Sequence, residues 1–314
     1  MKTYLVTAVG SFSATCVVNA IKHMGCKVVG TDIYPQQWHH IAKSCDKFYQ
    51  VPLSTTSEYI PKLIDICKKN VVDAVIPLTD LEIDVLRENT LKFKAIGCKL
   101  YIESDAILDI VRNKLRLTQT FCDNSIINVP KSYSSERYLK DHDVAVTKLI
   151  AKPVNGRSSE GLYRIDKGES LRFLDKKENY IIQECIDGSV YTVDYVRDCN
   201  GNAFAVPREE LLRTKNGAGI TVKITKDIEL IESAEYIGDK LKIVGCVNME
   251  FISNNGKFYL IDINPRFSAG IGFTIIAGYN IVQSHINAFE DGNIIPPIDF
   301  SEQVLEKVYV EVVN

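Results

Sequence analysis

Four polar side chains in the last third of the sequence have the types and spacing of a site for a metal ion and a phosphate group. Glu250 lies in one apolar run, and Asp262, Asn264 and Arg266 come at the end of the next run. Carboxylate and amide oxygens are ligands that Mg²⁺ prefers, and an arginine beside them could neutralise a transferring phosphoryl group. The alternative is an ordinary hairpin with a solvated acidic face. The functional interpretation is favoured because these polar residues alternate with apolar ones, where unpaired polar groups cost free energy.

A β-hairpin must position these side chains. The two apolar runs flank residues 254–257 (Asn-Asn-Gly-Lys), and Asn and Gly tolerate the positive φ angles of tight turns. Alternate residues of a strand share a face, so Asp262 and Asn264 are expected to point the same way. Glu250 joins them if the loop has three residues, at 255–257, or if a β-bulge intervenes. A plain two-residue turn alone would put Glu250 on the opposite face.

The composition excludes several other classes of function. Hydrophobic residues make up 46% of the 314 residues and charged residues 25%, and the net charge is −3, which predicts neither a nucleic-acid nor a membrane partner. The nine cysteines are scattered and form no Cys-x-x-Cys pair, which is typical of buried thiols in a reducing cytosol and not of a disulfide framework or zinc site. No signal peptide opens the sequence, and no apolar stretch approaches membrane-spanning length. The expected compartment is the cytoplasm.

The first third of the chain has the rhythm of a parallel α/β unit. Apolar runs at 4–9 and 27–31 enclose a segment with helical spacing, and helices are expected at 58–69 and 81–89. Only Gly10 is present of the glycine fingerprint that dinucleotide-binding folds need, so that function is not expected. Asp80 precedes a predicted helix, and the interpretation as a helix N-cap is favoured over a contact with substrate.

Three further segments carry candidate ligand contacts. Lys152 ends a predicted strand and is followed at 155–159 by small polar residues whose backbone N–H groups could cradle phosphate, although such a sequence also suits a simple hairpin loop. The basic, glycine-bearing segment 208–219 is equally compatible with an active-site loop and with a solvated one. Small residues at 268–272 precede a predicted helix and could receive a carboxylate. A closing strand is expected at 303–312, and His285 is expected in the core.

These strings resemble the ATP-grasp superfamily, in the style of carbamoyl-phosphate-synthase-like and D-alanine–D-alanine-ligase-like members. The resemblance lies in the Asp262–Arg266 string, which is similar to the family's Glu-x-Asn-Pro-Arg, and in the Lys152 segment with Gly161 behind it. Two positions depart from the family pattern. Asp262 stands where the family usually has Glu, and Val190 stands where many members have a Glu that binds ribose.

The resemblance implies the ATP-grasp fold, of mixed α/β and α+β class. A Rossmann-like N-terminal (pre-ATP-grasp) domain at 1–110 would precede the ATP-grasp domain at 111–314. The latter would contain a lid subdomain at about 115–187 and a C-terminal antiparallel sheet subdomain at about 188–314, in keeping with ordinary domain sizes.

The resemblance also assigns residues to the site. Mg²⁺, or Mn²⁺ in its place, would be held by Glu250, Asp262 and Asn264. Arg266 and Lys215 would be catalytic, and Arg208, Ser268 and Gly270 would bind substrate. Lys114, which taken alone is a surface lysine, would reach phosphate. The full set of implied ATP contacts is Lys114, Lys152, Ser158, Ser159, Gly161, Gln183, Glu184, Cys185 and Ile186.

The function implied is an ATP-dependent carboxylate–amine ligase that forms an acyl phosphate and releases ADP and phosphate. Its partners would be a small carboxylate and an amine, and a homodimer is left open. A carbamoyl-phosphate synthase large subunit carries two such modules and this chain has one, so that specific activity is not expected. The alternatives are a nucleotide-binding module without ligase turnover and a single-module enzyme similar to carbamoyl-phosphate synthase. A dehydrogenase is disfavoured by the missing glycine fingerprint.

Overall fold

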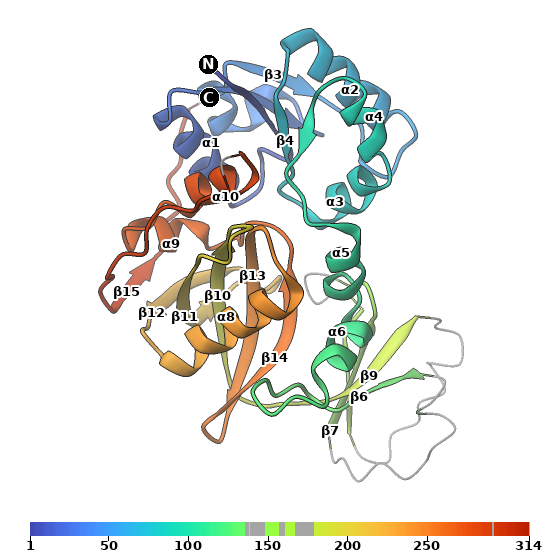
Figure 1. The fold of residues 1–314 in the computed structure, drawn as a ribbon, viewed down its shortest axis with the longest axis vertical. Helices are drawn as coiled ribbons and strands as arrows, with labels where there is room; N and C mark the ends of the chain where they lie inside the picture. The colour runs from blue at the N-terminus through green and yellow to red at the C-terminus, as the bar shows by residue number, and fades with distance from the viewer. Residues whose placement is uncertain (136–137, 139–147, 157–160, 167–178, 291, 314) are drawn as a thin grey trace.

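Three β-sheets organise the chain, and Figure 1 shows the parallel sheet at the top, the six-stranded sheet below it and the four-stranded sheet at the lower right. The computed structural model describes residues 1–135, 138, 148–156, 161–166, 179–290 and 292–313. The expected combination of a Rossmann-like start with later antiparallel sheets is confirmed.

The N-terminal sheet is parallel, with the order β3-β2-β1-β4-β5. All four residues of β1 are buried, as expected for a strand that helices cover on both faces. The strands are β1 (Thr3–Val6), β2 (Lys27–Asp32), β3 (Lys47–Gln50), β4 (Ala74–Ile76) and β5 (Lys99–Leu100). The helices between them are α1 (Ala14–His23), η1 (Gln36–Trp38), η2 (His40–Ser44), α2 (Tyr59–Asn70), α3 (Asp80–Arg87) and α4 (Thr90–Lys94). The order reverses between β1 and β4, which is where sheets of this kind commonly bind ligands.

Two helices lead from this sheet to a four-stranded antiparallel sheet with the order β6-β9-β7-β8. Asn113 caps the second helix, because its side chain accepts a hydrogen bond from the backbone N–H of Arg116. The elements are α5 (Asp105–Val111), α6 (Lys114–Phe121), β6 (Ser132–Ser134), β7 (Lys148–Pro153), β8 (Tyr163–Asp166) and β9 (Tyr180–Glu184).

The third sheet has the order β14-β13-β10-β11-β12-β15, with each neighbouring pair antiparallel. Its strands are β10 (Ser189–Arg197), β11 (Ala203–Arg213), β12 (Gly219–Ile224), β13 (Gly245–Asn254), β14 (Lys257–Asn264) and β15 (Gln303–Glu306), and its helices are α8 (Ile228–Leu241), α9 (Ile271–Ile276) and α10 (Ile281–Glu290). The predicted closing strand at 303–312 was too long, because only β15 pairs with β12 and residues 307–313 lie outside any strand. His285 is buried in the core, as expected.

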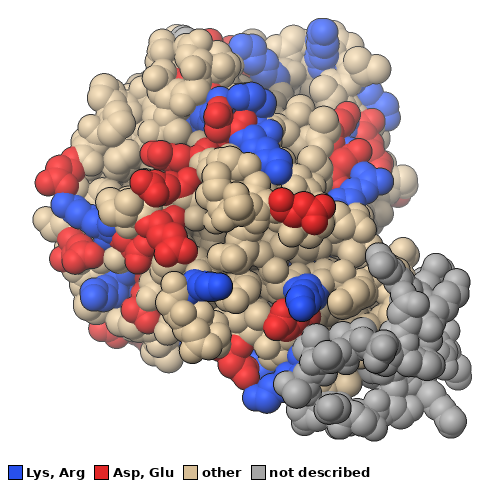
Figure 2. All heavy atoms as spheres, turned by 60° about the horizontal axis from the view of Figure 1, so that its bottom comes forward, with Lys and Arg blue, Asp and Glu red and all other residues tan. Residues whose placement is uncertain are grey.

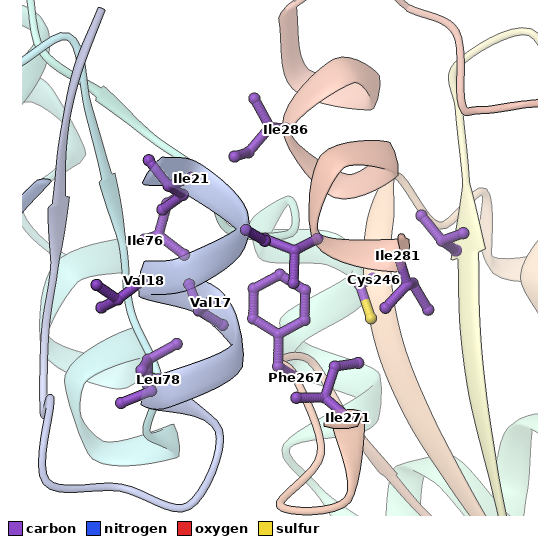
Figure 3. Packing of buried hydrophobic residues seen from close by; sticks show 14 of the residues in the cluster. Val17, Val18, Ile21, Ile76, Leu78, Cys246, Phe267, Ile271, Ile281 and Ile286 are labelled. Atoms are coloured by element: carbon purple, nitrogen blue, oxygen red, sulfur yellow. The ribbon is translucent and has the colours of Figure 1, made fainter. Parts of the chain in front are cut away.

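A shared apolar core joins the parallel sheet to the six-stranded sheet. Figure 3 shows Val17 of α1 facing the side that carries Phe267 and Ile281, and all three side chains are buried. In this core α1 packs against α9 and α10, so the parallel sheet is held beside the six-stranded sheet and can contribute to a site between them.

A buried carboxyl group at the same junction makes the stability depend on pH. Both oxygens of Glu103 accept a hydrogen bond from the backbone N–H of Val244, at 3.1 and 3.3 Å. Burial raises the pKa of Glu103 from 4.5 to about 8. Between these two pH values the folded state therefore holds a proton that the unfolded state has released, and the free energy of unfolding falls as pH rises, by at most about 1.4 kcal/mol per pH unit.

We expect Glu103→Gln to flatten this dependence, because the amide keeps an acceptor oxygen and carries no ionisable group. The melting temperature of the parent should fall more steeply from pH 5 to pH 8 than that of the variant. Glu88→Gln, at an exposed position, is the control and should follow the parent. Equal slopes for Glu103→Gln and the parent would contradict the assignment.

The surface carries both signs of charge. On the face shown in Figure 2, acidic and basic side chains lie interspersed, in keeping with the net charge of −3. In the described part of the chain, none of the helices has the length and apolar character needed to cross a membrane.

Candidate active site

A cavity of about 500 Å³ lies between the four-stranded sheet and the six-stranded sheet, and the β13–β14 hairpin of the latter forms part of its wall. This volume is within the range of small-molecule and cofactor sites. Most of the side chains predicted to form a site line it, namely Lys114, Lys152, Gln183, Glu184, Cys185, Ile186, Arg208, Glu250, Asp262, Asn264, Arg266, Ser268 and Gly270. Gly161 and Lys215 are not among its lining residues, and Ser158 and Ser159 lie outside the described residues.

The hairpin brings Glu250 and Asp262 together as direct cross-strand partners. The turn has only two central residues, Asn255 and Gly256, both with positive φ (50° and 74°). The register then shifts, because Glu250 pairs with Asp262 while the next residue, Phe251, pairs with Leu260. A β-bulge at residue 261 therefore turns the two carboxylates to one face. The alternative expected from the sequence, a three-residue loop, does not occur.

Each of these carboxylates is paired with a cation. Lys114 Nζ lies 2.9 Å from Asp262 Oδ2, and Arg213 Nη2 lies 3.3 Å from Glu250 Oε2. Burial raises the pKa of Glu250, which the charge of Arg213 opposes. Two ion pairs, Lys114–Asp262 and Arg213–Glu250, therefore lie side by side at the wall of the cavity.

The oxygen donors here fit a hard divalent cation. Asn264 donates from Nδ2 to Asn248 Oδ1 at 3.0 Å, which fixes its amide orientation and leaves Oδ1 as the acceptor that faces Arg266. Two carboxylates and one amide oxygen suit Mg²⁺ or Mn²⁺. The described residues contain no group of three or more His, Cys, Asp or Glu side chains arranged for a metal, so a site here depends on the amide and on ligand oxygens.

Two lysines add positive charge beside the carboxylates. Lys114 also donates to the backbone carbonyl of Gly156 at 2.9 Å, which ties α6 to the segment after β7. Burial, together with the charge of Lys114, lowers the pKa of Lys152 from 10.5 to about 8. Anionic groups of a ligand would be attracted to this end of the cavity.

Apolar side chains form another part of the cavity lining. Ile150, Val190, Ile252 and Ile261 belong to it, together with the segment Gln183–Ile186. Gln183 is buried, and its side chain donates to Ser132 Oγ at 2.8 Å. A flat apolar ring with polar edges would suit this combination of aliphatic walls and strand-end backbone groups.

Arg266 is held by a residue from the parallel sheet domain. Asp80 Oδ2 accepts from Arg266 Nε at 3.0 Å and from Nη2 at 2.8 Å. The N-cap of α3 is Thr79, and Asp80 is the first helical residue, so the prediction of an N-cap role for Asp80 was wrong. Burial would raise the pKa of Asp80, but the guanidinium groups of Arg266 and Arg112 outweigh it and lower that pKa.

Arg208 lies in the wall but is committed to partners within the protein. Only 1% of it is exposed, and it donates to Asp194 at 2.6 Å, Glu210 at 3.0 Å and Ser268 at 3.1 Å. A Cβ on Gly270 would come within 2.7 Å of the guanidinium, so the small residue there makes room for the arginine. The arrangement favours a supporting role for Arg208 and Ser268 over direct capture of substrate.

Arg213 and Phe12 line the cavity, although the sequence interpretation gave Arg213 no role of its own within the segment 208–219 and missed Phe12 altogether. Lys215 was the basic residue favoured in this segment, but its side chain is exposed, and Arg213 reaches the site in its place. Strand alternation could not have identified Arg213, because the register of β11 against β12 shifts on both sides of Leu212. Phe12 follows β1, and the glycine-poor sequence around it carried no ligand signal.

Comparison with protein families finds two matches. Residues 111–270 match an ATP-grasp domain, and residues 5–101 match the N-terminal domain of PylC-like proteins. The carbamoyl phosphate synthase large chain of Clostridium botulinum is 24% identical over 282 residues, which cover 83% of this chain and 26% of that protein. The chain thus spans about a quarter of the length of such relatives.

Solved structures with the same fold cover most of the chain. Biotin carboxylase from Campylobacter jejuni superposes with a TM-score of 0.77 at 17% identity, over 94% of this chain and 72% of that one. N5-carboxyaminoimidazole synthetase from Staphylococcus aureus gives 0.78 at 16% identity, over 96% and 81%. The L-amino acid ligase from Bacillus licheniformis gives 0.69 at 16% identity, over 94% and 78%.

Proposed function

This chain belongs to the ATP-grasp family, and from that premise we propose that it is an ATP-dependent ligase that activates a small carboxylate and joins it to an amine. The observation that carries the proposal is the pairing of Glu250 with Asp262 on one face of the hairpin, with Lys114 beside them in a cavity of about 500 Å³. Carboxylates and cations arranged in this way can bind a magnesium nucleotide. We further propose that the boundary between the N-terminal and ATP-grasp domains lies near residue 110.

The chemistry of transfer comes from ATP, whose γ-phosphoryl group would be attacked by the carboxylate of the substrate to give an acyl phosphate. Mg²⁺, held by Glu250, Asp262 and Asn264, would neutralise phosphate charge. The protein supplies position and charge. With both carboxylates engaged by a metal ion, Lys114 and Arg213, which pair with them in this structure, would be available to contact phosphate oxygens. Arg266 faces the same space and stabilises negative charge on the group in transfer.

The nucleophile is the second substrate, and we propose an amine that displaces phosphate from the acyl phosphate. The structural neighbours include an L-amino acid ligase and an N5-carboxyaminoimidazole synthetase, and these support a ligase without fixing the substrates. The nine cysteines are free thiols in the structure, which supports our proposal of the cytoplasm as the compartment.

A nucleotide-binding module without turnover is the second candidate. Val190 lines the cavity where a polar contact to ribose would be expected, and Asp262 is one methylene shorter than Glu. Such a module would bind ATP with Mg²⁺ and release no phosphate when carboxylates are added.

The test is a screen for phosphate release from ATP with amino acids and other small carboxylates, each with and without an amine. A ligase gives release that depends on the carboxylate and on Mg²⁺, together with a condensation product by mass spectrometry. Chelation of the metal with EDTA is the control for contaminating activity that needs no divalent ion. ATP binding with no stimulated release across the screen would favour the module without turnover.

A further inference from the structure

Asp80 links the N-terminal parallel sheet to the candidate active site. It lies just beyond the carboxyl end of β4, beside the reversal of strand order, and is 3% exposed. Its Oδ2 atom accepts two hydrogen bonds from Arg266, at 3.0 and 2.8 Å. A buried carboxylate that receives two charge-assisted hydrogen bonds from one guanidinium is a strong and directional contact.

Two further hydrogen bonds fix the orientation of the Arg266 guanidinium group. Nη1 donates to the backbone carbonyl of Phe267 at 3.2 Å, and Nη2 donates to Asn264 Oδ1 at 3.3 Å. Arg266 nevertheless lines the cavity, with 21% of its side chain exposed. A free arginine side chain has many rotamers, and ordering it during the reaction would cost conformational entropy. Here the folded protein has already ordered it.

We propose that Asp80 is a positioning residue that holds Arg266 in its orientation at the cavity wall, and that it does so without touching substrate itself. The N-terminal domain is then part of the catalytic unit. The expected effect of Asp80 on kcat rests on the proposed ligase function. The coupling between Asp80 and Arg266 can also be measured by nucleotide binding.

A second ion pair on the same helix provides a matched comparison. Asp84 lies one turn after Asp80 in α3 and binds Arg112 through two contacts, at 2.9 and 2.7 Å. Arg112 also lies 3.6 Å from Asp80, so both aspartates share this neighbour. Of the two aspartates, only Asp80 contacts Arg266. Replacing either aspartate by asparagine removes one charge from α3, but only one of the replacements releases Arg266.

The first experiment compares the steady-state kinetics of Asp80→Asn, Asp80→Glu and Asp84→Asn. We expect Asp80→Asn to lower kcat by about 10²-fold, since misplacement of a catalytic group by about 1 Å has an effect of that size. KM for ATP should change by less than about threefold, and Asp80→Glu should recover part of the loss. Asp84→Asn should stay within about twofold of the parent. If Asp80→Asn lowered kcat no more than Asp84→Asn did, the proposal would be overturned.

The second experiment is a double-mutant cycle with Arg266→Ala. If Asp80 acts through Arg266, then Asp80→Asn has no further effect on kcat once the arginine is gone, and additive losses would overturn the proposal. If the parent protein shows no carboxylate-dependent phosphate release, the ligase function is contradicted. The coupling between Asp80 and Arg266 is then measured by calorimetry with Mg²⁺ and the non-hydrolysable analogue AMP-PNP. There, the small loss of affinity expected for Asp80→Asn, below about threefold, should be absent in the Arg266→Ala background, and losses that add would contradict the pairing.

Discussion

We expect Asp262→Asn to abolish ligase turnover, with a loss in kcat of at least about 10³-fold, because a magnesium ion held here would lose one of its two carboxylate ligands. Asp262 is the residue of β14 that pairs with Glu250, so no other carboxylate of that strand can take its place beside Glu250. The amide keeps the shape of the side chain, so the fold should survive. Phosphate release in the presence of the best carboxylate from the screen, together with circular dichroism, measures both effects.

Three comparisons make this result specific to the metal. Asp262→Glu restores the residue usual in the family and should keep activity, because the bulge leaves the side chain on the same face. Asp299→Asn removes an exposed carboxylate that binds Lys226, and it should act like the parent. Raising Mg²⁺ should recover part of the activity of a variant with weakened metal affinity. Turnover by Asp262→Asn close to that of the parent would remove the metal site, and the ligase mechanism with it.

We expect the affinity for ATP to fall as pH rises through about 8, because Lys152 should lose its proton in that range. Burial lowers the pKa of Lys152 to about 8, so the lysine is charged below that pH and neutral above it. A charged lysine attracts phosphate and a neutral one does not. The dissociation constant for Mg·ATP should therefore increase above pH 8, by at most about tenfold per pH unit for a single proton.

Lys152→Arg and Lys152→Ala separate the charge from the rest of the side chain. The arginine stays charged at every pH of the experiment, so its dissociation constant should change less between pH 7 and 9. The alanine should bind ATP about tenfold or more weakly at pH 7, with little further change at pH 9. Titration by calorimetry at the two pH values gives all three results. If Lys152→Ala bound ATP as tightly as the parent, Lys152 would have no part in phosphate binding.

The sequence by itself determined the elements and most of the residues at the cavity. Apolar runs of strand length separated by helical segments predicted the parallel start, and the hairpin was predicted from its turn residues. These signals are local, since they depend on side-chain periodicity and on the backbone freedom of Asn and Gly. The polar string from Asp262 to Arg266 was informative because its residues alternate with apolar ones, and the structure places all of its polar members at one cavity.

Only the tertiary structure decided how these side chains are paired. The bulge at residue 261 lies in a strand whose sequence shows no break, and β14 is contacted there by Asn128, whose carbonyl accepts from the backbone N–H of Leu260. Arg213 in place of Lys215 follows from register shifts in β11, and the pairing of Asp80 with Arg266 joins residues 186 positions apart. Contacts of this kind depend on how sheets pack against one another, and no local pattern of residue types encodes that packing.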